Sequence, residues 1–215
     1  MKRALIVVDI QNDFLPGGAL AVPNGDVILP FVVQLLRSGL DYDLIVVTQD
    51  WHPLGHGSFA ASHRGIDPFQ LGELSGQPQM FWPDHCVEGT KGAQLSVEIE
   101  DVLGLVKAAG RSVVTVQKGQ DRNVDSYSAF FDNARLHDTG LQGVLEERGI
   151  SDVDVVGLAF DYCVKATAID AASLGFDTRV LLQGTRAVDP TAAAGIVSEL
   201  SEAGVVCVAS VVDEK

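Results

Sequence analysis

The stretch Asp154-Val155-Val156-Gly157-Leu158-Ala159-Phe160-Asp161-Tyr162-Cys163-Val164-Lys165 predicts a buried strand, a sharp turn and a helix that extends to about residue 174. Cys163 falls at the start of that helix, where unpaired amides and the helix dipole favour a negative charge. A cysteine at this position can act as a thiolate nucleophile, and the nearby amides can stabilise an oxyanion. Cys163 is therefore a candidate nucleophile, although the stretch taken alone favours an inert core thiol, which is what most free cysteines are.

Apolar runs alternate with helical patterns on both sides of this stretch. The further expected strands cover residues 4–8, 44–48, 112–117, 178–182 and 205–211. The further expected helices cover residues 97–109, 139–148 and 190–203, with another that ends near residue 38. Strands that alternate with helices indicate a mainly parallel sheet. We expect an α/β protein with a three-layer, doubly wound fold, in which helices flank a central β-sheet, and a single domain over residues 1–215.

The composition excludes several classes of function. The chain has 215 residues, of which 47% are hydrophobic, and 15 Lys+Arg against 29 Asp+Glu give a net charge of -14. So acidic a surface argues against nucleic acid as a partner. No run approaches the ~20 apolar residues that span a bilayer, and Asp9 ends the first apolar run well short of a signal-peptide core. Three scattered cysteines form no disulfide framework, so we expect a cytoplasmic protein without a membrane partner.

Three polar residues, Asp9, Lys118 and Cys163, each follow an apolar strand. In a parallel sheet these strand ends lie along one edge, so residues far apart in the sequence can come into contact. A carboxylate beside a cysteine can take the thiol proton and return it to a leaving amine, while a lysine favours both anions. The alternative is that Asp9 and Lys118 are ordinary strand-end charges with other partners.

The segment from residue 49 to residue 92 shows no sustained helical or strand period, and it holds four of the five histidines. A long ordered loop of this kind is usually functional. Asp50 and His52 leave an extended segment on the same side, and His85 can supply a third ligand. These residues suit one divalent metal ion, with zinc as the first expectation and iron or manganese as alternatives. The competing interpretation is that the histidines are surface residues, and we treat Cys86 as a packing residue.

Several aromatic residues lie close in sequence to these candidate groups. They are Phe14, Trp51, Phe81, Trp82, Tyr127, Phe130, Phe131 and Tyr162. Each of them taken singly is more simply explained as part of the core. Their concentration next to candidate catalytic residues indicates a pocket for a flat aromatic ligand, because small-ligand pockets are mostly apolar and aromatic with a few polar groups.

Taken together, these motifs closely resemble those of the nicotinamidases, a group within the isochorismatase-like cysteine hydrolases. The matching segments are Val8-Asp9-Ile10-Gln11-Asn12-Asp13-Phe14, Gly17-Gly18-Ala19-Leu20, Gln49-Asp50-Trp51-His52-Pro53, His56-Gly57-Ser58-Phe59, Phe81-Trp82-Pro83-Asp84-His85-Cys86-Val87, Lys118-Gly119, Asp125-Ser126-Tyr127-Ser128-Ala129-Phe130-Phe131-Asp132-Asn133 and Gly157-Leu158-Ala159-Phe160-Asp161-Tyr162-Cys163-Val164. They follow the order of the family. The Asp-Trp-His and Trp-Pro-x-His segments separate nicotinamidases from isochorismatases, which lack that metal site.

The resemblance implies a role for each candidate residue. The family's catalytic triad falls on Asp9, Lys118 and Cys163. Its metal ligands fall on Asp50, His52 and His85, and in some relatives a further histidine, here His56, also binds the metal. Its oxyanion hole falls on the amides of Ala159 and Cys163, with a non-proline cis peptide bond before Ala159. The residues that enclose a pyridine ring fall on Phe14, Trp82, Tyr127 and Tyr162.

The resemblance further implies a metal-containing amidase that converts nicotinamide to nicotinate and ammonia through a thioester on Cys163, serves NAD salvage and also hydrolyses pyrazinamide. The alternative is another hydrolase of the superfamily that acts on a different small amide or on isochorismate. Relatives usually carry Thr where this chain has Phe160, and a bulky ring there can alter the pocket wall or the turn. The oligomeric state stays open, with a homo-oligomer among the alternatives.

Overall fold

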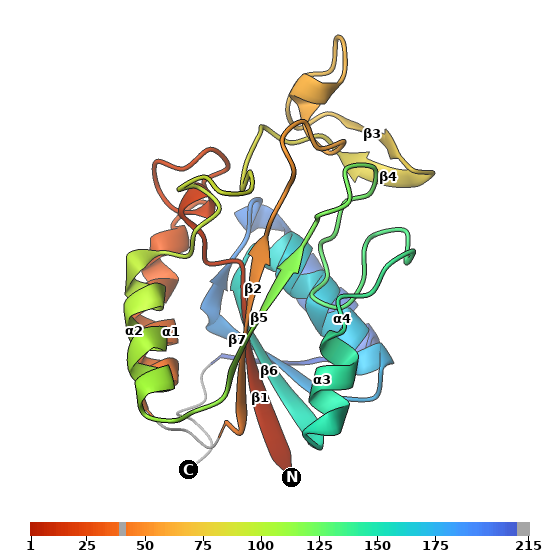
Figure 1. The fold of residues 1–215 in the computed structure, drawn as a ribbon. Helices are drawn as coiled ribbons and strands as arrows, with labels where there is room; N and C mark the ends of the chain where they lie inside the picture. Colours follow the sequence, from red (N-terminus) through yellow and green to blue (C-terminus); the bar gives the residue numbers. More distant parts are fainter. Residues whose placement is uncertain (39–41, 210–215) are drawn as a thin grey trace.

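A six-stranded sheet forms the centre of the computed structural model, which describes residues 1–38 and 42–209. The strands are β1 (Lys2–Val8), β2 (Leu44–Asp50), β5 (Val113–Lys118), β6 (Ile150–Leu158), β7 (Asp177–Arg186) and β8 (Val206–Val208). They lie in the order β5-β2-β1-β6-β7-β8, and each neighbouring pair is parallel (Figure 1). The predicted α/β class with a parallel central sheet is confirmed.

Successive residues of the central strands face two different cores. In β1, Leu5 and Val7 belong to one cluster of buried residues, and Ala4, Ile6 and Val8 belong to the other. This alternation follows from strand geometry, in which neighbouring side chains point to opposite faces of the sheet. Because both faces are covered, the central strands are continuous apolar runs instead of alternating ones.

Helices cover both faces of the sheet and complete the predicted three layers. The first core receives α1 (Leu29–Arg37) and α2 (Val97–Ala108), which pack against each other. The second core receives α3 (Leu141–Glu147), α4 (Lys165–Ser173) and α5 (Ala193–Glu202). In Figure 1, α1 and α2 stand on one side of the sheet and α3 and α4 on the other. Two layers of helices therefore bury the sheet and leave the carboxyl ends of its strands to form a site.

The long segment after β2 contains a hairpin that the sequence did not predict. Its strands, β3 (Leu71–Leu74) and β4 (Gln77–Met80), are antiparallel and lie beyond the tips of β2 and β5 (Figure 1). Two residues join them, Ser75 and Gly76, and both have positive φ, as a tight hairpin turn requires. The strands are short and mostly exposed, so they lack the apolar period that marks a strand in sequence. The Ser-Gly pair was the one local signal of the turn.

Most other element boundaries agree with the sequence to within a few residues. The predicted helix at 190–203 begins as a single 3₁₀ turn (Pro190–Ala192) before α5, and β7 continues four residues past its predicted end. The last strand was predicted over 205–211, whereas β8 covers Val206–Val208 and residues 210 and 211 lie outside the described part. Within the described residues, no helix is both long and apolar enough to cross a membrane.

Candidate active site and metal centre

The ends of four neighbouring strands bring the candidate residues to one edge of the sheet. Asp9 follows β1, Lys118 and Asp50 are the last residues of β5 and β2, and Cys163 follows β6 after a short turn. The order β5-β2-β1-β6 places Asp50 between the other groups, directly opposite Lys118 in the register of its strand pair. The predicted meeting of distant strand ends is therefore observed, and it also includes Asp50.

Lys118 is the centre of this cluster. Its Nζ lies 2.9 Å from Oδ2 of Asp9 and 3.4 Å from Sγ of Cys163, and it also forms an ion pair with Oδ1 of Asp50. A fourth contact of 2.9 Å goes to the backbone oxygen of Ser126. Burial by itself would lower the pKa of Lys118, but Asp50 and Asp9 raise it well above its usual value. The lysine is therefore a fixed cation between two carboxylates and a thiol.

Asp9 is fully buried and has the properties of a group that exchanges protons near neutral pH. Burial raises its pKa from 3.8 to about 6, although the positive charge of Lys118 acts in the opposite direction. Its Oδ1 accepts a hydrogen bond of 2.5 Å from the hydroxyl of Thr48, and the backbone N–H of Asp9 donates to Oγ1 of Thr48 at 3.2 Å. A carboxylate with a raised pKa and fixed orientation suits general acid and base chemistry.

Cys163 lies in a π-helical turn, Phe160–Val164, that precedes α4. Turns of this type are rare and often occur at functional sites. Burial raises the pKa of the Cys163 thiol well above its usual value, whereas the charge of Lys118 lowers it and the charges of Asp9 and Asp50 raise it. The helix start that the sequence analysis identified is thus opposed by burial of the sulfur. Loss of the proton must be coupled to an acceptor, and Asp9 has an oxygen within 4.8 Å of the sulfur.

The predicted oxyanion residues, Ala159 and Cys163, line the same pocket. The peptide bond between Leu158 and Ala159 is cis, as the resemblance implies. The carbonyl of Ala159 accepts a bond of 3.1 Å from the N–H of Val164, five residues on, which closes the π turn. The turn thus holds the backbone of Ala159 beside the sulfur, where both amides can be near a reacting carbonyl.

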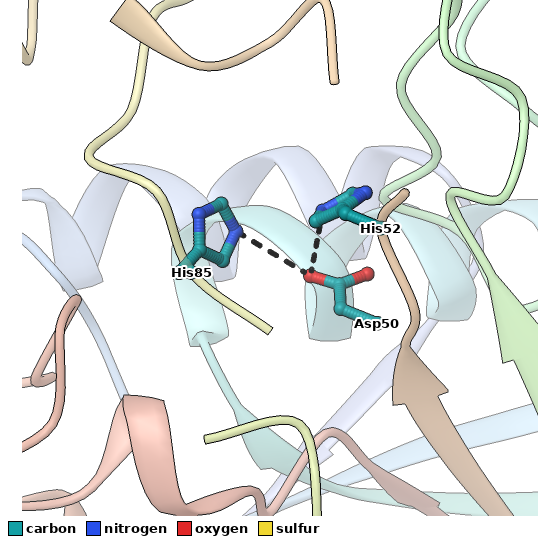
Figure 2. Close-up of side chains that lie close together, drawn as sticks. All are labelled: Asp50, His52 and His85. Carbon is teal, nitrogen blue, oxygen red and sulfur yellow. Dashed lines mark ion pairs between the residues drawn. The ribbon is translucent and has the colours of Figure 1, made fainter. Parts of the chain in front are cut away.

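Asp50, His52 and His85 form a second cluster next to the first. Figure 2 shows both imidazoles turned toward one oxygen of Asp50, and each Nε2 lies 3.8 Å from that Oδ2. This is too long for a hydrogen bond, but two atoms that each bind one zinc ion at about 2.1 Å lie roughly 3.4 Å apart in tetrahedral geometry. The second oxygen of Asp50 is the one that contacts Lys118. The carboxylate therefore serves both clusters.

The hydrogen bonds of the two histidines fit a metal centre. Nδ1 of His52 lies 2.8 Å from the carbonyl of Gly119, and Nδ1 of His85 lies 2.8 Å from that of Pro83. When Nδ1 carries the proton and donates it to the carbonyl, Nε2 keeps a free lone pair, which is available to a metal ion. Burial lowers the pKa of both imidazoles, which favours the neutral form that binds metals. Nε2 of His52 is also buried without a hydrogen-bond partner, as expected of an atom kept for a cation.

Gly119 has a positive φ of 68°, and a Cβ there would lie 2.4 Å from the ring of His52. Only glycine therefore lets the backbone pass close enough for its carbonyl to hold the imidazole. His56, the additional histidine, instead uses its ring nitrogens on protein groups, with Nδ1 2.8 Å from Oγ of Ser58 and Nε2 2.7 Å from the carbonyl of Asp121. These contacts make His56 a support for the surrounding loops in this structure.

A narrow pocket opens between the two clusters. Its lining residues are Phe14, Leu20, Asp50, Trp82, His85, Asp125, Tyr127, Ala159, Tyr162, Cys163 and Val188. The four aromatic residues that the resemblance implies for the ring are among them, whereas Trp51, Phe81, Phe130 and Phe131 are not. The ring of Tyr162 meets Trp82 at 4.8 Å and Tyr127 at 5.4 Å, both edge to face. The pocket therefore has aromatic walls, and its lining includes both the thiol of Cys163 and the Asp50 and His85 side chains.

Of the two places that Phe160 could affect, the pocket wall and the turn, the structure places it in the turn. Phe160 is the first residue of the π-helical turn, is buried in the second core with residues such as Phe130 and Ala168, and is not one of the pocket-lining residues. Cys86 lies in the first core, as predicted for a packing residue. The Phe160 ring therefore contributes to core packing from within the nucleophile turn.

Three residues in the site were not assigned roles from the sequence. Thr48 orients Asp9. The side-chain amide of Gln11 holds the backbone of Asp50: it donates to the Asp50 carbonyl and accepts from the Asp50 N–H, at 2.8 Å each. Asp125 lines the pocket with Oδ1 4.0 Å from Nε2 of His52. Thr48 and Asp50 are two residues apart in one strand, so their shared face was a usable signal. The roles of Gln11 and Asp125 depend on loop conformations, and loop sequences show no helical or strand period that would predict them.

Comparisons with known proteins agree with this geometry. The family model described as the isochorismatase domain matches residues 3–210. The nicotinamidase of Acinetobacter baylyi is 48% identical over 186 residues, which cover 86% of this chain and 82% of that protein. The structure of the yeast nicotinamidase bound to the inhibitor nicotinaldehyde gives a TM-score of 0.89 at 38% identity, with 96% of this chain and 99% of that chain covered. The structure of a Pyrococcus horikoshii pyrazinamidase in complex with zinc gives 0.74 at 33% identity, covering 97% and 99%.

The chain therefore belongs to the isochorismatase family of α/β proteins. Within that family it falls among the nicotinamidases, to which it is similar over most of its length.

Proposed function

We propose that this chain hydrolyses nicotinamide to nicotinate and ammonia, and that it also accepts pyrazinamide, which keeps a ring nitrogen at the same position relative to the carboxamide. The observation that carries the proposal is a pocket with aromatic walls that is lined by Cys163 of the Cys-Asp-Lys cluster and by Asp50 and His85 of the His-His-Asp cluster. Such a pocket fits a flat ring whose carboxamide lies over the thiol. The similarity to the nicotinamidases of several organisms supports the same substrate.

Asp50, His52 and His85 are proposed to hold one divalent cation, zinc in the first instance, with iron and manganese as alternatives. Buried neutral imidazoles and a carboxylate form a donor set that suits each of these metals. When bound, the cation would supply a positive charge that holds the pyridine nitrogen directly or through water. The zinc in the related pyrazinamidase of Pyrococcus horikoshii supports this choice of metal.

The first half of the proposed reaction forms a thioester. Asp9 takes the proton of Cys163 as the sulfur attacks the carboxamide carbon, and the carbonyl electron pair moves onto oxygen near the amides of Ala159 and Cys163. The tetrahedral species then collapses, the C–N bond breaks, and Asp9 delivers its proton to the leaving nitrogen as ammonia departs. Lys118 keeps its proton throughout and stabilises whichever of the two partners carries the negative charge.

The second half releases nicotinate. Asp9, now ionised, takes a proton from water as the water oxygen attacks the thioester carbon. The C–S bond breaks, and the proton on Asp9 returns to the sulfur of Cys163. The overall balance is one amide and one water consumed, one carboxylic acid and one ammonia released. The raised pKa of Asp9, about 6, suits a group that must accept and donate a proton twice in each cycle.

An assay of ammonia release from nicotinamide by the purified protein tests the proposal. Cys163→Ala should abolish release while the thermal unfolding midpoint stays close to that of the wild type. Substantial turnover by Cys163→Ala would reject the covalent route, and no turnover by the wild type would reject nicotinamide as substrate. Isochorismate and other small amides serve as competing substrates, because the alternative hydrolase would use the Cys163 cluster without needing His52 and His85.

Three broader proposals accompany this function. Residues 1–215 form one domain, since one sheet order connects strands from both ends of the described chain. The protein acts in the cytoplasm, and it needs no nucleic acid or membrane partner. Gel filtration with light scattering would measure the oligomeric state, for which a homo-oligomer is one alternative.

A further inference from the structure

The hairpin β3–β4 has little burial of its own. Most residues of its two strands are exposed or half-buried, but Gln79 is only 2% exposed. A two-stranded hairpin without an apolar face is marginal in water. Its position is therefore determined by contacts with the rest of the chain. One of these is packing of Gly72 over Phe81, where a Cβ would lie 2.4 Å from the ring.

Gln79 connects the hairpin to the pocket. Its Nε2 lies 2.9 Å from Oδ2 of Asp125 and 3.1 Å from the hydroxyl oxygen of Tyr127, with a third contact of 2.8 Å to the carbonyl of Met80. The carboxylate of Asp125 accepts hydrogen bonds, so the amide group of Gln79 must present its NH₂ to it. The hydrogen bond from a buried donor to a carboxylate is among the stronger ones that a neutral side chain can make.

The two partners of Gln79 are both part of the pocket wall. Tyr127 and Asp125 line it, and Nε1 of Trp82 lies 3.3 Å from the same Tyr127 hydroxyl oxygen. The Tyr127 oxygen thus accepts from Gln79 on one side and from Trp82 on the other. Asp125 accepts a second bond of 2.8 Å from the backbone N–H of Ser126, which completes its fixation. Removing the Gln79 amide would leave the Tyr127 hydroxyl held by Trp82 and take from one Asp125 oxygen its Gln79 donor.

We propose that Gln79 is a positioning residue for substrate, which acts through the hydroxyl of Tyr127 to hold the Tyr127 and Trp82 rings at the spacing that a pyridine ring requires. The inference rests on the proposed function, and it makes the exposed hairpin part of the substrate site. Gln79 touches no reacting atom, so its effect falls on binding. Preorganised walls raise affinity because the ordering of Tyr127 and Trp82 is complete before the ligand arrives.

The test compares Gln79→Met, which keeps the length of the side chain without its amide, with Gln77→Met. Gln77 is the same residue type on the same strand, but it is exposed. Gln79→Met should raise KM for nicotinamide about five- to tenfold, the size expected for loss of one net hydrogen bond to a charged or polar partner, with a smaller change in kcat. Gln77→Met should leave both constants unchanged.

A binding measurement provides a readout that does not depend on turnover. In a Cys163→Ala background, calorimetric titration with nicotinamide should show the same rise in Kd for Gln79→Met. Tyr127→Phe alone should also raise KM, and Gln79→Met added to it should have much less effect than on the wild type, because the two changes remove one interaction.

An active wild type whose Gln79→Met variant keeps the KM and Kd of the Gln77→Met control would overturn the inference and leave the proposed function intact. Full additivity with Tyr127→Phe would overturn the route through Tyr127. A wild type that does not hydrolyse nicotinamide would overturn the proposed function, and the inference with it.

Discussion

Lys118 and Asp50 form a buried ion pair that joins the nucleophile cluster to the histidine cluster. One oxygen of Asp50 contacts the ammonium, while the other faces His52 and His85. Burial alone would raise the pKa of Asp50, but the positive charge of Lys118 holds it below its usual value. The carboxylate is therefore ionised in both of its roles, and a change at Lys118 must affect the metal group as well as the thiol.

Removal of Lys118 should destabilise the fold and stop catalysis. Lys118→Met leaves Asp9 and Asp50 buried without their common cation, and we expect a loss of about 3 kcal/mol in the free energy of unfolding. Urea denaturation measures the loss. Lys165→Met is the control, because its pair with Glu199 is partly exposed and should change stability by less than about 1 kcal/mol. Equal effects of the two substitutions would contradict the central role of Lys118.

The pH profile should report the ionisation of Asp9. Asp9 must be deprotonated to take the thiol proton, and burial raises its pKa to about 6, so kcat/KM should rise with pH through about 6 and then level. Thr48→Val removes a hydrogen bond that favours the carboxylate, so the pKa of Asp9 should increase and the limb should move to higher pH. The exposed Thr115→Val on the neighbouring strand β5 should leave the limb in place. If the limb stays at the same pH in Thr48→Val, it reports the ionisation of a group other than Asp9.

Metal content should depend on His85 and be independent of His56. Elemental analysis should find one bound divalent ion per chain in the wild type and a loss in His85→Ala, together with a raised KM. Free zinc at about 100 times its Kd should add about 2.7 kcal/mol to the stability of metal-free protein. His56→Ala should retain the ion while losing about 1–3 kcal/mol of stability from its broken contacts.

The control for these histidine variants is His137→Ala, since His137 is largely exposed and pairs with Asp132 outside the metal group. It should keep both the ion and the KM of the wild type. Loss of metal in His56→Ala with retention in His85→Ala would reverse the assignment of ligands.

Phe160 should matter for stability and be silent in substrate binding. Phe160→Ala removes a ring that is 3% exposed in the second core, which should reduce the free energy of unfolding by about 3–5 kcal/mol. KM for nicotinamide should stay unchanged, since Phe160 is not one of the pocket-lining residues. Denaturation and steady-state kinetics on the same preparation separate the two effects. A large change in KM with little change in stability would return Phe160 to the pocket wall.

Much of the fold was predictable because its signals are local. The apolar runs before Asp9 and Lys118 are long enough to identify buried strands, and parallel topology then brings their ends together. The meeting of Asp50 with Lys118 followed from the strand order, which the runs do not specify. Gln79 was invisible for a different reason: its strand is four residues long, contains Pro78 and has one buried side chain, so no period can form.

The pKa of the Cys163 thiol is set by several opposing effects. A position at a helix start lowers the pKa of a cysteine. Burial raises it and determines the net direction, while the charge of Lys118 opposes those of Asp9 and Asp50. Neither burial nor those neighbours can be weighed until the strands are placed side by side.

The two cores on opposite faces of the sheet have a consequence for how the site tolerates change. Phe14 and Trp82 are anchored in the first core and Cys163 in the second, while Tyr162 packs against both. The pocket therefore lies where the two cores, each acting as one packing unit, meet, and its width depends on the distance between them. A substitution that shifts one unit against the other, unlike one that only leaves a void within a unit, would move the ring-binding wall relative to the sulfur.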